Sequence, residues 1–348
     1  MAQKHFGLSE GTWAVIKKQG RSTMRAYRQT LIGRLSCGPK SCSSWRAIPV
    51  RCPTLTELPS PPPGKAGWPW TEESLQLPDT LPQGSPWPRI SIVTPSYNQG
   101  QFVEETIRSV LLQGYPDLEY VVMDGGSTDG SVEIIRKYET SLSYLHIGPD
   151  GGQSAAIGEG FRHATGEIWA WLNSDDRYRP GALGRVAHFF ARDAKVVLGN
   201  GDANVVNTNG RVIKRWYAMQ PSRFLAANFG VQDWPQQACF WRSWAYKKAG
   251  GMDRSLQYCL DLDLFIRLMK VASSGRIPGP PLADFRVHDR AKSSTIVNIH
   301  DEERAALVER YGNPRMRSRE RLLRLMRRFW HGPVALRSRL NRACGWEW

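Results

Sequence analysis

The sequence has no run of about 18 apolar residues, and its N-terminus lacks the apolar core of a signal peptide. It therefore predicts neither a transmembrane helix nor secretion, and we expect a cytoplasmic protein. None of the six cysteines belongs to a CxxC pair, and no histidine lies near the first three at zinc-ligand spacing. Reduced thiols are therefore favoured over structural zinc.

Positive charge is concentrated at the two ends of the chain, whose net charge is +15. Residues 1–85 contain 11 basic and 5 acidic residues, residues 86–303 contain 24 of each, and residues 304–348 contain 12 and 3. An enzyme that acts on nucleic acid would more often carry a basic groove in its catalytic domain. The distribution argues for a neutral catalytic domain with basic ends, and against nucleic acid as a partner.

Ordered structure is predicted to begin sharply near residue 89. Residues 1–52 show only weak helical patterning and are predicted to be a poorly defined basic extension. Residues 53–88 hold ten prolines and are predicted to be a Pro-rich linker. We expect the main domain over residues 89–300 and a basic helical tail over residues 301–348.

Four apolar strand segments alternate with helical segments in the first half of the main domain. The strand segments and the loops that follow them read RISIVTPSYN, LEYVVMDGGSTDGS, SLSYLHIGPDGG and EIWAWLNSDD. Nearly all-apolar strands in a β-α-β-α-β-α-β order predict an α/β fold, in which a mostly parallel sheet is covered on both faces. Right-handed crossovers make such a sheet doubly wound.

A polar loop follows each of these strands: TPSYN, DGGSTDGS, PDGGQS and NSDD. Ligands bind at the carboxyl ends of parallel strands, so the four loops are predicted to converge on one binding site. No G-x-G-x-x-G opens the first helix, and no G-x-x-x-x-G-K-[ST] is present. A Rossmann dinucleotide site and a P-loop are thereby excluded.

Taken together, TPSYNQGQFVEETIRSVLLQ, VVMDGGSTDGS and PDGGQSAAIGEGFRHATGEIWAWLNSDD resemble the family 2 inverting glycosyltransferases of the GT-A fold, over roughly residues 89–290. The resemblance implies a nucleotide-sugar half (89–180), an acceptor half (181–300) and C-terminal helices. It implies sugar transfer from a nucleoside-diphosphate sugar, with a UDP-sugar favoured, to a hydroxyl acceptor. A glycan or a lipid-linked sugar is the expected acceptor, as in cell-surface polysaccharide or glycolipid synthesis.

Two adjacent carboxylates, Asp175 and Asp176, follow an apolar strand in NSDD. A hard divalent cation takes oxygen ligands and can neutralise a diphosphate. The resemblance implies that Asp176 holds Mn²⁺ or Mg²⁺, and that Asp175 faces the ribose or shares the metal. It also sets His288 near the metal or diphosphate. The alternatives are a solvated aspartate pair that caps the next turn and a structural histidine.

The resemblance implies a nucleotide-sugar site built mainly from the four loops. Its predicted residues are Pro95, Ser96, Tyr97, Glu105, Asp124, Gly125, Asp150, Gln153 and Asp175. The residue types fit these roles: Tyr97 offers a ring to stack on a base, Asp124 can accept a base N–H, and Gly125 allows close approach of the backbone. Tyr97 packed in a tight turn and Glu105 in an ordinary acidic first helical turn remain the alternatives.

The third loop and its helix depart from the usual family run, DGGQSDAINKG. Ala155 replaces an aspartate, Gly158 an asparagine and Glu159 a lysine. Loss of a lysine near a diphosphate weakens the electrostatic case for donor contacts from this helix, although Arg162 is a partial substitute.

The acceptor half contains the segment LDLDLFIRL. An inverting transfer needs a general base to deprotonate the acceptor hydroxyl. The resemblance implies that Asp261 is this base, with Leu260 where many members have glutamate. The alternative is that Asp261 and Asp263 are carboxylates favoured at a helix N-terminus by the helix dipole. Earlier in this half, Asn209–Gly210 predicts the turn of a β-hairpin.

The basic tail contains RSRERLLRLMRRFWHG, whose apolar residues are spaced along one face of a helix. A basic amphipathic helix suits an anionic membrane surface, which would make the protein peripheral at the inner face of the plasma membrane. Packing of this helix on the domain is an equally weighted alternative.

Two other functions stay open at this point. A non-catalytic sugar-nucleotide-binding protein would tolerate Asp261→Asn. A nucleotidyltransferase of related architecture would need a Gly-rich loop with a basic residue after the first strand, and TPSYNQG has none.

Overall fold

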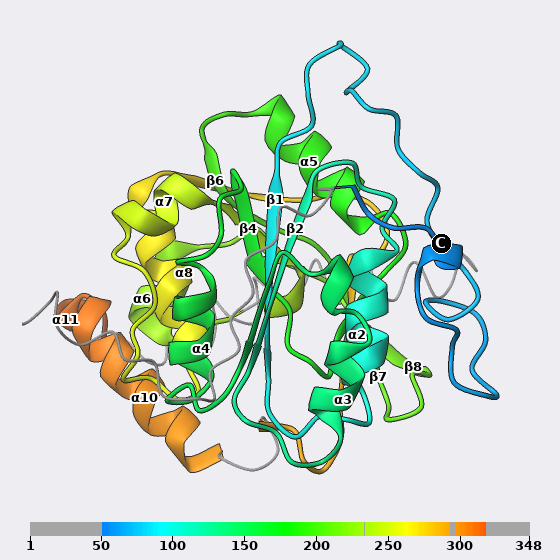
Figure 1. Ribbon diagram of the computed structural model, residues 1–348. Helices are drawn as coiled ribbons and strands as arrows, with labels where there is room; N and C mark the ends of the chain where they lie inside the picture. Colours follow the sequence, from blue (N-terminus) through cyan, green and yellow to red (C-terminus); the bar gives the residue numbers. More distant parts are fainter. Residues whose placement is uncertain (1–50, 233, 293–296, 318–348) are drawn as a thin grey trace, which may run out of the picture. The chain divides into compact units, whose positions relative to one another are not determined.

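The computed structural model describes residues 51–232, 234–292 and 297–317 (Figure 1). These residues all belong to one compact unit that begins at Cys42. Most of the predicted N-terminal extension and the apolar stripe of the predicted tail helix lie outside the described residues. Among the described residues, no helix is both long and apolar enough to span a bilayer.

A seven-stranded sheet forms the centre of the unit, in the order β10-β6-β9-β4-β1-β2-β3. β1 pairs in parallel with β2 and β4, β2 pairs in parallel with β3, and β9 runs antiparallel to both β4 and β6. The predicted mostly parallel α/β sheet is therefore confirmed. Its strands are β1 (Ile90–Ser96), β2 (Leu118–Asp124), β3 (Tyr144–Ile147), β4 (Ile168–Trp171), β6 (Val196–Asn200), β9 (Cys239–Arg242) and β10 (Ser273–Arg276).

Helices cover both faces of this sheet, which explains why every residue of β1 and β4 is buried. Figure 1 shows the sheet nearly edge-on, with α2 and α3 on one side and α4 and α8 on the other. The helices of the main body are α2 (Val103–Leu111), α3 (Ser131–Arg136), α4 (Gln153–Gly160), α5 (Ala182–Arg192), α6 (Arg223–Phe229), α7 (Ser243–Lys248) and α8 (Leu260–Val271). The short 3₁₀ helices are η1 (Leu55–Glu57), η2 (Glu139–Ser141) and η3 (Gln236–Ala238).

A second sheet of four strands has the order β5-β11-β7-β8. Its strands are β5 (Arg177–Tyr178), β7 (Ala203–Val206), β8 (Val212–Trp216) and β11 (Ala283–Arg286). β7 and β8 form the predicted antiparallel hairpin, and Gly210 at its turn has φ +76°. β11 pairs with β5, which directly follows the NSDD loop, so the end of this loop is anchored to the second sheet.

The segment predicted as a linker, residues 53–88, packs on the domain, so its interpretation as a spacer between parts of the chain is wrong. Leu58, Leu81 and Trp87 between the prolines are buried in the same apolar cluster as the central sheet. The fully buried guanidinium of Arg108 on α2 donates to the backbone oxygens of Pro59, Pro69 and Trp70. Residues 53–88, called the strap below, are therefore held on the domain by buried apolar side chains and by hydrogen bonds from Arg108 to backbone carbonyls. Composition alone did not reveal these contacts.

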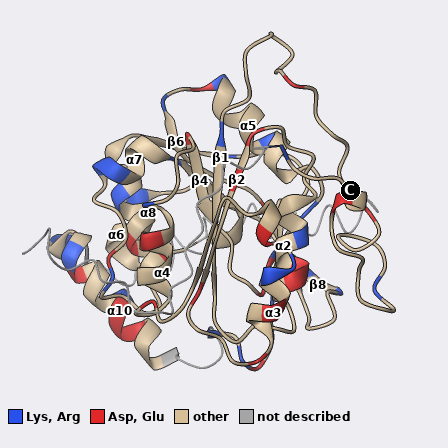
Figure 2. Ribbon diagram, viewed as in Figure 1, with Lys and Arg blue, Asp and Glu red and all other residues tan. Residues whose placement is uncertain are grey.

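Two further helices, α10 (Val297–Tyr311) and α11 (Pro314–Arg317), end the described chain. The Glu303 carboxylate on α10 accepts hydrogen bonds from the backbone N–H groups of Gln257, Tyr258 and Cys259, just before α8. A carboxylate at these donors is favoured by the positive end of the helix dipole. In Figure 2, α2 carries both signs of charge, in keeping with the balanced count over residues 86–303.

Candidate active site

Two cavities meet at the carboxyl ends of the parallel strands, where the strand order reverses between β1 and β4. The loop cavity, about 560 Å³, is bordered by Pro95, Ser96, Tyr97, Gln99, Gly125, Pro149, Asp150, Gly151, Gly152, Gln153, Asn173, Ser174, Asp175, Arg290 and Lys292. The aromatic cavity, about 250 Å³, is bordered by Gln153, Trp171, Asn173, Asp175, Trp216, Gln232, Trp234, Gln236, Gln237, Tyr258, Leu260, Asp261, Phe285, Ala291, Lys292 and His300. The four side chains common to both are Gln153, Asn173, Asp175 and Lys292.

The loop cavity brings together residues from all four predicted loops. Tyr97, at the edge of this cavity, is 63% exposed, so its ring is accessible for stacking on a planar ligand. A Cβ at Gly125 would lie 3.0 Å from Asp150 Oδ2 and 3.3 Å from Tyr97 Cδ2, so only glycine leaves this cleft open. The Ser96 hydroxyl is buried at the cavity wall and has no hydrogen-bond partner among the described residues. These features suit a flat ring with polar edges.

Two predicted nucleotide-site residues face elsewhere. The fully buried Asp124 carboxylate accepts hydrogen bonds from Gly126 N, Ser127 N and Ser127 Oγ, so it stabilises its own turn. Glu105 pairs with Arg177 and, at 2.7 Å, with Arg286. Neither acid borders either of these two cavities, and both depart from their predicted roles because closer partners take their oxygens.

The adjacent acids of NSDD point in different directions. Asp175 borders both cavities, and its Oδ2 lies 3.1 Å from His288 Nε2. Asp176 is 1% exposed and borders neither; its Oδ1 accepts from Arg286 N on β11 at 2.9 Å. Burial, together with the Asp175 charge, raises the pKa of Asp176 well above its usual value. The Oδ2 atom of Asp176 is buried without a hydrogen-bond partner among the described residues, but of the two acids Asp175 alone borders the cavities, so cavity access favours Asp175 as the ligand for a cation bound there.

The donor set at Asp175 fits a divalent cation that is shared with a diphosphate. In the part of the chain that the structure describes, no three His, Cys, Asp or Glu side chains are grouped to hold a metal by themselves. The Asp175 carboxylate borders the loop cavity, and the Nε2 atom of His288, which itself borders neither cavity, lies 3.1 Å from Asp175 Oδ2. Mg²⁺ and similar hard ions are commonly held by one or two carboxylates together with substrate phosphates. Arg290 and Lys292 add positive charge at the same wall.

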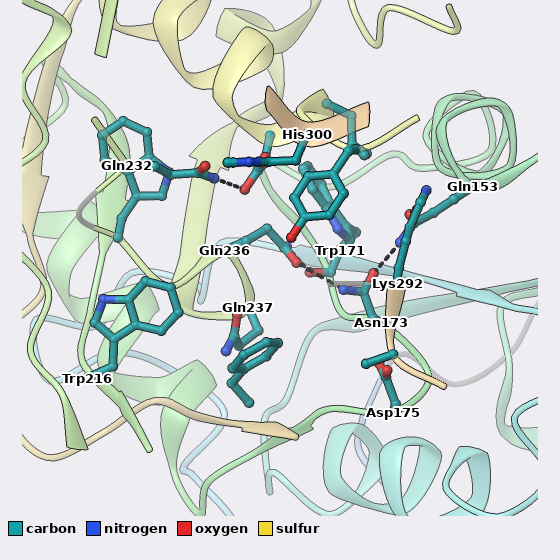
Figure 3. Close-up of a pocket in the computed structure, with 16 residues that line it drawn as sticks. Gln153, Trp171, Asn173, Asp175, Trp216, Gln232, Gln236, Gln237, Lys292 and His300 are labelled. Atoms are coloured by element: carbon teal, nitrogen blue, oxygen red, sulfur yellow. Dashed lines mark hydrogen bonds between the residues drawn. The ribbon is translucent and has the colours of Figure 1, made fainter. Parts of the chain in front are cut away.

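A chain of side-chain amides separates the two cavities (Figure 3). Lys292 Nζ donates to Gln153 Oε1 at 2.8 Å, and Gln153 Nε2 donates to Asn173 Oδ1 at 2.9 Å. Gln236 continues the chain, since its Oε1 accepts from Asn173 Nδ2 at 3.4 Å and its Nε2 donates to Trp171 O at 2.9 Å. Each member is oriented by the next, so the wall is preorganised.

Asp261 borders the aromatic cavity at the start of α8, the position predicted for the base. Its Oδ1 accepts from Leu262 N at 2.8 Å, and Gln232 donates its side-chain amide to Oδ2, as Figure 3 shows by a dashed line. Burial raises the pKa of Asp261 to about 6, and these hydrogen bonds oppose the shift. A carboxylate tuned in this way can accept a proton near neutral pH.

Asp263, two residues on, is structural. It is fully buried, pairs with Arg267, and accepts from the Tyr311 hydroxyl of α10 at 2.6 Å. Helix α10 therefore fastens α8 at two points, through Asp263 and through the Glu303 carboxylate before Asp261.

Sequence reasoning missed several residues of the aromatic cavity. Gln232, Tyr258 and His300 come from three separate loops and helices, and no local pattern marks them. Asn173 was visible as the first residue of the NSDD loop, and its place in that loop was the available signal. Trp234 also borders this cavity; it is buried, and its ring centroid lies 5.8 Å from that of Phe265.

Residues 91–249 match the family model described as Glycosyl transferase family 2. An uncharacterized glycosyltransferase of Rickettsia typhi is 27% identical over 226 residues, which cover 63% of this chain and 70% of the relative. A Bacillus subtilis protein named for teichuronic acid biosynthesis, TuaG, is 33% identical over 105 residues, or 29% of this chain and 42% of TuaG.

Solved structures with similar folds include Staphylococcus aureus TarS 1–349 in complex with UDP-GlcNAc, with a TM-score of 0.49 and 19% identity. The match covers 60% of this chain and 61% of that chain. A Pyrobaculum calidifontis mannosyltransferase in complex with GDP-Man and Mn²⁺ has a TM-score of 0.46 and 20% identity, over 60% and 62% of the two chains. This chain thus spans about three fifths of each solved chain.

Proposed function

We propose that this chain transfers a sugar, with inversion, from a nucleoside-diphosphate sugar to a hydroxyl acceptor, a proposal supported by the match of residues 91–249 to the family model described as Glycosyl transferase family 2. The observation that carries the proposal is the shared wall of the two cavities. A diphosphate that lies in the loop cavity beside Asp175 would direct the anomeric carbon towards the cavity that contains Asp261.

The loop cavity is the proposed nucleotide site. Tyr97 would stack on the base. The base or the ribose would lie in the cleft beside Gly125 and Asp150, which a side chain at position 125 would narrow. Ser96 Oγ and the backbone of Gly151 and Gly152 offer further polar contacts. A UDP-sugar is the favoured donor.

The charge of the diphosphate would be matched by groups in and beside the loop cavity. Asp175 and His288 would hold Mn²⁺ or Mg²⁺, which when bound would neutralise the leaving diphosphate. Arg290 and Lys292 would add donors to its oxygens.

The chemistry then falls to Asp261. Its carboxylate accepts the proton of the acceptor hydroxyl, the hydroxyl oxygen forms a bond to the anomeric carbon, and the bond from that carbon to the diphosphate oxygen breaks. Gln232 and Leu262 N hold the carboxylate in place. Precise positioning of the two reactants supplies much of the rate enhancement in such transfers.

We further propose a glycan or lipid-linked sugar as the acceptor, in cell-surface polysaccharide or glycolipid synthesis. The partial similarity to TuaG, a protein named for teichuronic acid biosynthesis, supports this class. Attachment to the inner face of the membrane through the basic tail remains part of the proposal.

The test is donor turnover by the purified full chain. UDP-, GDP- and dTDP-sugars are supplied with Mn²⁺ and a set of free and lipid-linked acceptors, and products are detected by mass spectrometry. We expect a glycosylated product with the wild type and none above background with Asp261→Asn. Intact nucleotide binding without turnover by the wild type would instead favour a non-catalytic binding protein.

A further inference from the structure

The aromatic cavity has the walls of a sugar site. Trp171 at the end of β4, Trp216 at the end of β8 and Phe285 on β11 contribute flat apolar surfaces from three strands. Trp216 and Phe285 meet edge to face, with ring centroids 6.1 Å apart. Aromatic faces with polar groups between them suit a pyranose ring, which has apolar faces and a hydroxylated edge.

The polar groups between these walls are mostly uncharged. Five of the bordering side chains are amides: Gln153, Asn173, Gln232, Gln236 and Gln237. The charged groups are Asp175, Asp261 and Lys292, and arginine does not occur among the bordering residues. A sugar carboxylate would therefore meet two aspartates and no bidentate partner, whereas hydroxyl and amide groups match the amides.

Gln237 differs from the other amides. It lies in η3, its side chain is 3% exposed, and its Nε2 has no hydrogen-bond partner among the described residues. The neighbouring Gln236 has both ends engaged, with Trp171 O and with Asn173 Nδ2 at 3.4 Å. Figure 3 shows Gln237 within the cavity, near Trp216. A buried donor without a partner is costly unless a ligand satisfies it.

We propose that Gln237 is a specificity-determining residue that donates a hydrogen bond to an oxygen of an uncharged sugar ring held in the aromatic cavity. The proposal rests on the proposed function for the identity of the site, and the ring belongs either to the transferred sugar or to the acceptor. Gln237 would select between ligands because its amide is buried away from water. A ligand that lacks the oxygen leaves this amide without a hydrogen bond and therefore binds less tightly.

Gln237→Leu is the test variant, because it keeps the size of the side chain and removes the amide. Its melting temperature should equal or exceed that of the wild type, since no protein hydrogen bond is lost. Gln113→Leu is the matched control. Gln113 is a buried glutamine outside both cavities that bonds Ser109 O, Arg179 O and Leu183 N, so its loss should lower the melting temperature and leave sugar binding unchanged.

Calorimetry with Mn²⁺ separates the two sources of the sugar ring. The donor arm compares UDP with UDP-glucose, UDP-GlcNAc and UDP-glucuronate, and the acceptor arm compares octyl glucoside with octyl glucuronide in the presence of UDP. We expect Gln237→Leu to leave UDP affinity within about twofold and to weaken one neutral sugar ligand about tenfold or more. We also expect the wild type to bind UDP-glucuronate or the glucuronide at least about tenfold less tightly than the neutral partner in that arm.

The role of Gln237 would be overturned if Gln237→Leu bound every sugar ligand in both arms as tightly as the wild type does. It would also be overturned if the variant had both a lower melting temperature and a lower affinity for UDP. Equal or tighter binding of the glucuronate ligand would overturn the preference for an uncharged ring. These are binding measurements, so they remain decisive even if the wild type fails to transfer sugar, which is the outcome that would count against the proposed function.

Discussion

Asp175 and Asp176 are adjacent in sequence, yet only the Asp175 carboxylate borders the two cavities, while that of Asp176 is fixed by Arg286 N. The peptide that joins them marks the boundary between the site and its support. Asp175 faces His288, and Asp176 faces β11.

This division predicts opposite results for two matched substitutions. Asp175→Asn should weaken Mn²⁺-dependent UDP binding at least about tenfold, because it removes the anionic ligand. Asp176→Asn should change this affinity little, because the amide oxygen can still accept from Arg286 N and the raised pKa of Asp176 favours its neutral form. Titration calorimetry with and without EDTA measures both variants. If Asp176→Asn alone loses the metal effect, the assignment drawn from the sequence is the correct one.

Asp261→Asn should remove transfer and raise stability at neutral pH. The rate should fall by about 10²–10⁴-fold, the usual contribution of a general base. The pKa of Asp261 in the folded chain, about 6, lies above the ordinary aspartate value of 3.8, so the unfolded chain ionises first and stability is lost as pH rises from about 4 to 6. At pH 8 the free energy of unfolding of the wild type should therefore be lower than that of Asp261→Asn by roughly 2–3 kcal/mol. At pH 4 the two proteins should be equally stable. Urea denaturation at the two pH values measures the difference.

Asp263→Asn is the control on the same helix. It breaks the pair with Arg267 and weakens the contact with Tyr311, so it should lower the melting temperature at pH 8.

The rate of sugar transfer by the wild type should rise with pH through about 6 and then level, with a one-proton slope, because Asp261 must be ionised to act as the base. A rate that does not change between pH 5 and 8 would argue against Asp261 as the base.

Gly125→Ala should close the base cleft. Its Cβ would stand 3.0 Å from Asp150 Oδ2, which is closer than ordinary contacts allow, so UDP affinity should fall about tenfold or more. Gly158→Ala is the control: the nearest atom to its Cβ is Met252 Cβ at an ordinary 3.5 Å, and alanine favours helix α4. Equal UDP affinity for both variants would mean that the nucleotide does not enter the cleft between Tyr97 and Asp150.

Arg108→Met should detach the strap formed by residues 53–88. It leaves the carbonyls of Pro59, Pro69 and Trp70 without their donor, and we expect a loss of about 3 kcal/mol or more in the free energy of unfolding. Arg136→Met is the control, because Arg136 is about half exposed and pairs only with Glu139 at 3.5 Å, an arrangement that contributes at most about 1 kcal/mol. Urea denaturation measures both, and equal midpoints would show that the strap does not stabilise the domain.

Much of the fold could be predicted from local patterns. Apolar runs such as Ile90–Ser96 and Ile168–Trp171 are short, nearly continuous and followed by polar loops, which is typical of strands buried on both faces. The antiparallel pairing of β9 with β4 and β6 was not predicted, because pairing between strands distant in sequence leaves no local periodicity.

The candidate site was predictable only in part, for a related reason. Tyr97, Gly125 and Asp150 face the loop cavity because their loops follow parallel strands. Glu105 and Asp124 had equally suitable chemistry, but Arg177, Arg286 and the Ser127 turn claim their oxygens. Residue type indicates what a side chain can bind, and the nearest partner in space decides what it does bind.

The sequence by itself determined the order of strands and helices and the edge of the sheet where the polar loops gather, because periodicity and chain direction are local properties. The tertiary structure decided which of two neighbouring aspartates faces that edge, since the partner of Asp176 lies 110 residues away on β11. It also decided that the Pro-rich segment is part of the domain, because a buried arginine on α2 binds carbonyls that composition leaves unassigned.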